Sequence, residues 1–178
     1  MRKIIKALYN PFIQFYFNSK LKSFTKKKQI KEFLVLDIDN TIADTWTNLK
    51  DFKKNRKEYF LNLKPLLGTI KYVRKNFSEL PIVFISNRNI IDYSVTKKWL
   101  KKNGFNMNEN LLIVTNNPID KVQYLKYLSE NFKIHYFDDL SYNHEKGSVL
   151  FFDDVLNQVK KMNLNYYDYQ FILNLNTQ

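Results

Sequence analysis

Residues 33–45 read FLVLDIDNTIADT, and this stretch decides the fold. Its first residues, 33–36, are all apolar, and two acids, Asp37 and Asp39, follow them closely. A short apolar run that stops abruptly at acidic residues is typical of a buried strand that ends in a polar loop. The stretch therefore predicts a strand inside a sheet, with carboxylates at its carboxyl end.

The rest of the chain alternates strands and helices. Further strands are expected at 82–85, 111–114, 133–137 and 149–152, and helices at 66–77, 96–103, 120–128 and 155–161. Gly104 is expected to cap the second of these helices, and no element is assigned to the aromatic residues 162–178. Helices between strands imply right-handed crossovers. We therefore expect an α/β fold, a Rossmann-like three-layer sandwich with a mainly parallel sheet and helices on both faces.

The N-terminal residues 1–31 differ from the remainder of the chain, because they carry many Lys and Arg residues, no acid, and aromatic and aliphatic residues in between. Polar residues interrupt the apolar run, so it does not reach the ~20 apolar residues that span a bilayer, and no cleavage site comes after it. We expect a basic amphipathic N-terminal extension at 1–31 and one domain at 32–178. The extension either lies on an anionic membrane or packs on its own domain or a partner.

The composition limits the classes of function. A net charge of +12 suggests an anionic partner such as nucleic acid, a membrane surface or a phosphorylated polymer. The abundance of Asn, Ile, Phe and Tyr, with only 3 Gly and 4 Pro, is also what AT-rich coding produces, so the charge alone does not indicate a function. The lack of cysteine excludes a disulfide scaffold, a thiolate zinc site and a cysteine nucleophile. It favours a cytoplasmic setting, with a peripheral position at the membrane as the alternative.

Polar side chains follow the predicted strands at the edge where ligands bind in such sheets. They are Asp37, Asp39 and Thr41 after the first strand, Ser86, Asn87 and Arg88 after the second, Lys121 at the start of a helix, and Asp138 and Asp139 after the fourth strand. Carboxylate oxygens of this kind can hold a hard divalent cation while the cationic side chains neutralise a phosphate. The sequence therefore predicts a metal-assisted phosphate site at this edge.

Four motifs in this order resemble those of the haloacid dehalogenase superfamily. LVLDIDNT resembles its first motif, Asp-x-Asp-x-Thr, and IVFIS at 82–86 resembles the second. Lys121 stands where the third motif has a lysine, and IHYFDD at 134–139 resembles the fourth. Members of this superfamily differ in their inserted caps. The gap at 45–63 has room for about one helix, so the resemblance implies a nearly capless phosphatase domain.

The resemblance implies a Mg²⁺-dependent phosphomonoester hydrolase that works through an aspartyl-phosphate. Asp37 is the implied nucleophile. Asp39 is the implied acid and base, with its side chain turned away from the metal and its backbone carbonyl on the metal. Asp138 is implied to bind the metal directly, and Asp139 directly or through water. An acid at Asp39 also argues against dehalogenation.

The resemblance further implies a group of residues around the transferred phosphate. Ser86 would donate a hydrogen bond to the phosphoryl oxygens, and Lys121 would offset the charge on the nucleophile and the phosphate, so both count as catalytic. The implied phosphate contacts are Thr41, Ser86, Asn87, Arg88 and Lys121. Arg88 is the candidate for bidentate recognition of the substrate.

Several residues compete with these assignments. Asp153 and Asp154 form a second FDD after an apolar run, and Lys126 is a second lysine in the third-motif helix. Asn143 and His144 are expected in the loop after the fourth motif, with His144 in a structural role.

An open site favours a macromolecular or sugar-linked phosphate as substrate. The alternatives are a phosphatase of small metabolites that is closed by oligomerisation, and a non-catalytic binding module of the same fold. A polynucleotide 3′-phosphatase would suit the net charge. Against it, the core has no interleaved aromatic and basic recognition motif.

Overall fold

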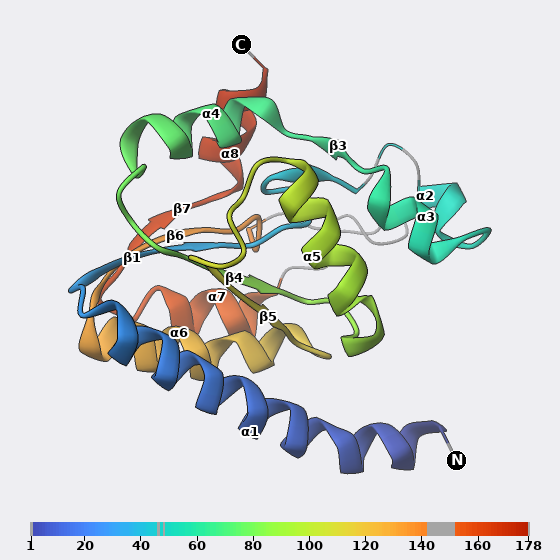
Figure 1. Ribbon diagram of the computed structural model, residues 1–178, viewed down its shortest axis with the longest axis horizontal. Helices are drawn as coiled ribbons and strands as arrows, with labels where there is room; N and C mark the ends of the chain where they lie inside the picture. Colours follow the sequence, from blue (N-terminus) through green and yellow to red (C-terminus); the bar gives the residue numbers. More distant parts are fainter. Residues whose placement is uncertain (1, 46, 48, 142–151, 178) are drawn as a thin grey trace.

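A parallel sheet of five strands lies at the centre of the described part of the chain (Figure 1). The computed structural model describes residues 2–45, 47, 49–141 and 152–177, and of these the side chains of all but 2–9 and 49. In spatial order the strands are β5 (Leu111–Val114), β4 (Ile82–Ser86), β1 (Glu32–Leu36), β6 (Lys133–Phe137) and β7 (Asn165–Tyr167). Each strand pairs in parallel with its neighbours. The predicted α/β fold with a parallel central sheet is confirmed.

Helices cover both faces of the sheet and complete the three expected layers (Figure 1). One face carries α4 (Leu67–Asn76), α5 (Tyr93–Lys102) and α8 (Tyr169–Asn176). The other face carries α1 (Arg2–Lys28), α6 (Lys121–Asn131) and α7 (Asp153–Val159). The 3-10 turns η1 (Ile90–Asp92) and η2 (Pro118–Asp120) lead into α5 and α6. Gly104 follows α5 with φ +79°, the left-handed conformation expected of a helix cap.

The central strand β1 is buried on every side. Phe33, Leu34, Val35 and Leu36 are each 0% exposed, because β1 pairs with β4 on one edge and β6 on the other, with helices over both faces. This environment explains why the strand is a continuous apolar run rather than an alternating one. Asp37 therefore directly follows a strand that is held on both edges and both faces.

The sheet ends in a strand that the sequence did not reveal. We expected the fifth strand at 149–152, but the first three of these residues lie outside the described part of the chain, and Phe152 directly precedes α7. The fifth strand described is β7, within the segment 162–178 to which no element was assigned. Its Tyr167 ring stacks on Phe137 of β6, with 4.1 Å between the ring centroids. A strand of three residues is too short to show a periodicity.

Helix α8, also unpredicted, packs closely against α4. The Asn176 side chain accepts hydrogen bonds from the backbone N–H groups of Gly68, at 2.9 Å, and Thr69, at 3.3 Å. It thereby satisfies donors at the start of α4 that no side chain of that helix caps. A Cβ atom on Gly68 would lie 1.8 Å from the carbonyl oxygen of Leu175, so the close approach of the two helices requires glycine there.

The gap between β1 and α4 forms a small cap. We expected one helix, but the described part of the gap holds two short ones, α2 (Leu49–Phe52) and α3 (Arg56–Leu61), beside the antiparallel pair β2 (Ala43–Asp44) and β3 (Lys64–Pro65). Asn55 separates the two helices because its side chain accepts a hydrogen bond from the N–H of Glu58 and caps α3. Arg56 Nε donates to Asp92 Oδ1 at 2.8 Å and so anchors α3 to η1.

Helix α1 packs on the domain through one of its sides. Phe17 and Leu21 are at most 1% exposed, and the hydroxyl of Thr25 lies 3.0 Å from that of Tyr127 on α6. The helix ends at Lys28, because Gln29 adopts φ 52°. Of the environments expected for the extension, this side of α1 has the second: it packs on its own domain. No helix in the described part of the chain is long and apolar enough to cross a membrane.

Candidate active site

The loop after β1 brings two acids to the carboxyl edge of the sheet. The N–H of Asp37 donates to the carbonyl of Phe137 on β6 at 2.9 Å, so the acid follows directly from paired strand. The chain then turns back, with the N–H of Ala43 donating to the carbonyl of Ile38 at 2.9 Å. Asn40 takes the left-handed φ of 55° that this turn requires. The turn keeps Asp39 near the edge where Asp37 lies.

Lys121, the first residue of α6, joins acids from two neighbouring strands. Its Nζ donates to Asp37 Oδ1 at 2.8 Å and to Asp138 Oδ2 at 2.7 Å, and the three side chains are each at most 5% exposed. Burial by itself would lower the pKa of Lys121, but the charges of Asp138 and Asp37 outweigh burial and raise that pKa above its ordinary value. The ammonium therefore stays charged and holds both carboxylates together.

A third carboxylate, that of Asp139, completes a cluster suited to a cation. Ligand oxygens of Asp37, Asp138 and Asp139 lie within 4.8 Å of one another. Burial raises the pKa of Asp37 to about 7 against the opposing pull of Lys121, and burial and the neighbouring acids raise that of Asp139 well above its ordinary range. Bringing these carboxylates together disfavours their ionised forms, and a bound cation would favour them. An all-oxygen set of this kind fits a hard divalent cation such as Mg²⁺.

Asp39 has different partners. The Arg88 guanidinium donates two hydrogen bonds to its carboxylate, from Nε to Oδ2 at 2.8 Å and from Nη2 to Oδ1 at 2.6 Å. Ser86 Oγ donates a third, to Oδ2 at 3.0 Å. Burial would raise the pKa of Asp39, but Arg88 and the Ser86 hydrogen bond outweigh it and lower that pKa below its ordinary value. The Arg88 guanidinium also lies over the Phe60 ring of the cap, 4.2 Å from its centroid.

The remaining predicted phosphate contacts have different environments. Thr41 is 0% exposed, and its Oγ1 has no hydrogen-bond partner within the described part of the chain. A buried hydroxyl without a partner is costly, so Thr41 is a donor available to an incoming group. Asn87 is exposed, unlike Ser86 and Arg88 on either side of it.

The rival residues lie away from this cluster. Asp153 and Asp154 are exposed in the first turn of α7, and the carboxylates that gather with Asp37 are Asp138 and Asp139. Lys126 is exposed on α6 and faces Glu130 at 3.9 Å. The loop residues Asn143 and His144 lie outside the described residues.

Two tyrosines that the sequence did not suggest support Asp138. The hydroxyl of Tyr136 donates to Asp138 Oδ2, and that of Tyr166 donates to the Asp138 carbonyl at 2.9 Å. Burial and the charge of Asp138 raise the pKa of Tyr136 well above its ordinary value, so it remains a donor. Tyr136 stands two residues before Asp138, and this alternate spacing was the signal in the sequence for a contact between them. Nothing in the sequence pointed to Tyr166, because β7 was not predicted.

We expect Arg88→Gln to destabilise the protein by about 1–3 kcal/mol near neutral pH, because Asp39 loses its charged hydrogen-bond partner. Arg88 lowers the pKa of Asp39 in the folded state, so its contribution is present above the unfolded pKa of about 4 and is lost as the pH falls through the folded value. Urea unfolding of parent and variant at neutral and acidic pH checks this. Arg88→Lys keeps the charge but loses the two-pronged hydrogen bonding of the guanidinium. Its free energy of unfolding should therefore lie between those of the parent and Arg88→Gln. An equal loss at both pH values would contradict the pairing.

Comparisons with known proteins bear on the fold. No protein-family model matches the sequence, and no curated protein matches it. A chain of the Pnkp1/Rnl/Hen1 complex is similar in structure, with a TM-score of 0.53 and 15% identity over 79% of this chain and 47% of that chain. The present chain thus spans about half its length, and the likeness concerns the α/β fold. The class C acid phosphatase from Bacillus anthracis with tungstate bound gives a TM-score of 0.47 at 19% identity, covering 93% of this chain and 78% of that chain.

Proposed function

We propose that this chain is a Mg²⁺-dependent phosphomonoester hydrolase of the haloacid dehalogenase type, with Asp37 as the nucleophile. The observation that carries the proposal is the buried bridge from Lys121 to Asp37 and Asp138, with Asp139 beside it. Three carboxylates whose ligand oxygens lie within 4.8 Å of one another repel each other when ionised, and a divalent cation bound between them would offset that repulsion. This convergence supports a site built to bind a metal.

The proposed first half-reaction transfers the phosphoryl group to Asp37. A carboxylate oxygen of Asp37 forms a bond to phosphorus as the bond from phosphorus to the leaving oxygen breaks, and Asp39 gives that oxygen a proton. In the second half, Asp39 takes a proton from water, and the water oxygen displaces Asp37 and releases phosphate. A bound Mg²⁺ would supply positive charge to the phosphoryl oxygens and keep Asp37 ionised.

Arg88 has to change partners in this scheme. While the Arg88 guanidinium is hydrogen-bonded to both oxygens of Asp39, it lowers the pKa of Asp39 and so disfavours the protonated carboxyl that the first half-reaction uses. We therefore propose that the substrate phosphate draws Arg88 away from Asp39, which raises the pKa of Asp39 as the substrate binds. Phe60, against which Arg88 stacks, lies on the cap and would guide this exchange.

The substrate proposed is a phosphate on a macromolecule or a sugar-linked phosphate, because the cap is small: its described residues form two short helices and the β2/β3 pair. A small-metabolite phosphatase and a non-catalytic module are the competing proposals. A screen of the purified protein with Mg²⁺ against phosphopeptides, phosphorylated oligonucleotides, sugar phosphates and nucleotides separates them. Selective turnover of a small metabolite would favour the former alternative, and no turnover of any substrate would favour the latter.

We expect hydrolysis of a generic aryl phosphate with Mg²⁺, and its loss when EDTA removes the cation, because the positive charge that would act on the phosphoryl oxygens and keep Asp37 ionised is then gone. Release of the aryl alcohol, followed by absorbance with and without re-added Mg²⁺, is the measurement. Mg²⁺ should also raise the Tm of the parent, but much less that of Asp138→Asn, which loses one charged ligand. Full activity in EDTA would refute the metal requirement.

A further inference from the structure

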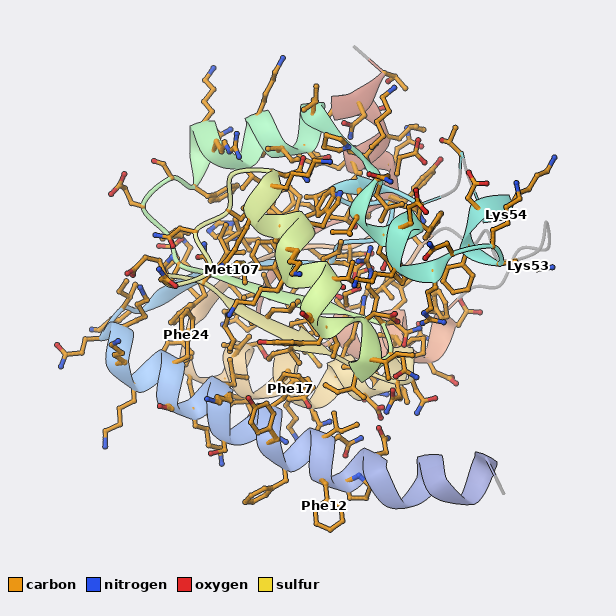
Figure 2. All side chains as sticks on the ribbon, turned by 45° about the vertical axis from the view of Figure 1, so that its right-hand side comes forward. Phe12, Phe17, Phe24, Lys53, Lys54 and Met107 are labelled. Atoms are coloured by element: carbon orange, nitrogen blue, oxygen red, sulfur yellow. The ribbon has the colours of Figure 1, made fainter. Side chains whose placement is uncertain are left out.

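Among the described side chains of helix α1, residues 10–28, apolar residues lie on two faces, and the domain covers one of them. On the inner face, Phe17 and Leu21 are buried in the core. On the outer face, Phe12, Phe15 and Tyr16 are 74%, 75% and 51% exposed. Figure 2 shows Phe12 pointing away from the body of the protein and Phe17 toward it. Exposed aromatic side chains this close together are costly in water and indicate a surface that binds something.

A basic residue borders the outer face. Lys20 is exposed, and its ammonium lies 5.5 Å from the centroid of the Tyr16 ring. Residues 1–31 contain no acid. An aromatic stripe beside basic residues is the pattern of a helix that lies in the interface of an anionic bilayer.

The placement of α1 relates this face to the proposed active site. Asn10 and Gln14 on α1 donate hydrogen bonds to the carboxylate of Asp120 at 3.2 and 3.0 Å. Asp120 directly precedes Lys121. Phe12 lies between the two donors along the helix, so the exposed aromatics are carried at the end of the molecule that holds the carboxylate cluster.

We propose that the outer face of α1, formed by Phe12, Phe15, Tyr16 and Lys20, binds the surface of an anionic lipid bilayer while the inner face stays docked on the domain. A second copy fits less well, because a symmetric contact would bring two basic faces together. Nucleic acid also fits less well, because the exposed phenylalanines Phe12 and Phe15 stand in a stretch, residues 7–19, that contains no Lys or Arg. The binding goes beyond phosphate hydrolysis and does not require it.

The test is co-sedimentation of the full chain with vesicles of phosphatidylglycerol and phosphatidylcholine in equal parts, against phosphatidylcholine alone. The parent should bind the anionic vesicles, and Phe12→Gln/Phe15→Gln should bind at least about tenfold more weakly. Lys20→Gln should weaken binding severalfold, with a reduced salt dependence. Leu67→Gln/Ile91→Gln is the matched control, because these side chains are 56% and 73% exposed on other elements, and it should bind like the parent.

Phe12→Trp supplies a second readout, since its fluorescence should shift to the blue when anionic vesicles are added. The proposal is overturned if the parent does not bind these vesicles or if Phe12→Gln/Phe15→Gln binds as well as the parent. It is also overturned if that variant instead loses binding to an oligonucleotide or loses dimers seen in the parent. Asp37→Asn should still bind vesicles, and Phe12→Gln/Phe15→Gln should still hydrolyse a soluble aryl phosphate. Failure of this proposal is therefore distinguishable from failure of the proposed reaction.

Discussion

Asp37→Asn is expected to lower kcat for an aryl phosphate by at least about a thousandfold, because the amide cannot attack phosphorus. The substitution nearly preserves the shape of the side chain. The amide oxygen can still accept the hydrogen bond that Lys121 donates to Asp37 at 2.8 Å. Steady-state hydrolysis with saturating Mg²⁺ measures the effect, and thermal unfolding in the same buffer shows whether the variant is folded.

A matched control for this prediction comes from the rival acids. Asp153→Asn/Asp154→Asn removes two exposed carboxylates in α7, and it should leave turnover within about twofold of the parent because surface substitutions of this kind are nearly neutral. Undiminished turnover by Asp37→Asn would refute the nucleophile. If the control variant lost turnover instead, Asp153 and Asp154, not Asp138 and Asp139, would be the acids of the fourth motif.

Lys121→Met is expected to abolish turnover and to destabilise the metal-free protein by about 3–5 kcal/mol near neutral pH. Methionine fills a similar volume but leaves Asp37 and Asp138 buried, 5% and 1% exposed, without their cation. Denaturant unfolding in EDTA measures the loss. Lys126→Met is the control, because that lysine is 67% exposed on the same helix, and it should change stability by less than about 0.5 kcal/mol.

The loss in Lys121→Met should depend on pH with a defined sign. Burial raises the folded pKa of Asp37 above its unfolded value of about 4, and without the ammonium nothing from Lys121 opposes that effect. The neutral form of Asp37 is then favoured in the folded state, so the variant is most stable below the unfolded pKa and loses stability as the pH rises through the folded value. Mg²⁺ should recover part of the loss. A deficit that stays constant from acidic to neutral pH would show that lost packing, not charge, is the cause.

The parts of the fold that the sequence predicted are those with strong local signals. β5 and β6 have the predicted boundaries, and β1 and β4 differ by one residue. In β1, β4 and β5 the signal is an apolar run with polar neighbours. β7 was missed because its stability comes from pairing and ring stacking on β6, which local pattern does not encode.

The candidate site shows the same division. The gathering of Asp37, Lys121 and Asp138 was expected, because parallel strands end at one edge. The hydrogen bonds from Arg88 to Asp39 were not expected, since the sequence suggested only that Arg88 faces the substrate. A pairing between two loops is set by side-chain geometry that no spacing reveals. The roles of these residues in catalysis remain predictions, which turnover by the Asp37 and Lys121 variants tests.

The central position of β1 has a consequence for how the chain is made. β1 pairs with β6 in a register that joins Phe33 to Ile134, so the strand gains its second neighbour only after most of the chain has been synthesised. Pairings between such distant residues form slowly. Until then, an emerging chain carries a wholly apolar strand with an open edge, the kind of segment that associates with other chains. The segment that supplies the proposed nucleophile is therefore also one that chaperones would need to protect on the ribosome.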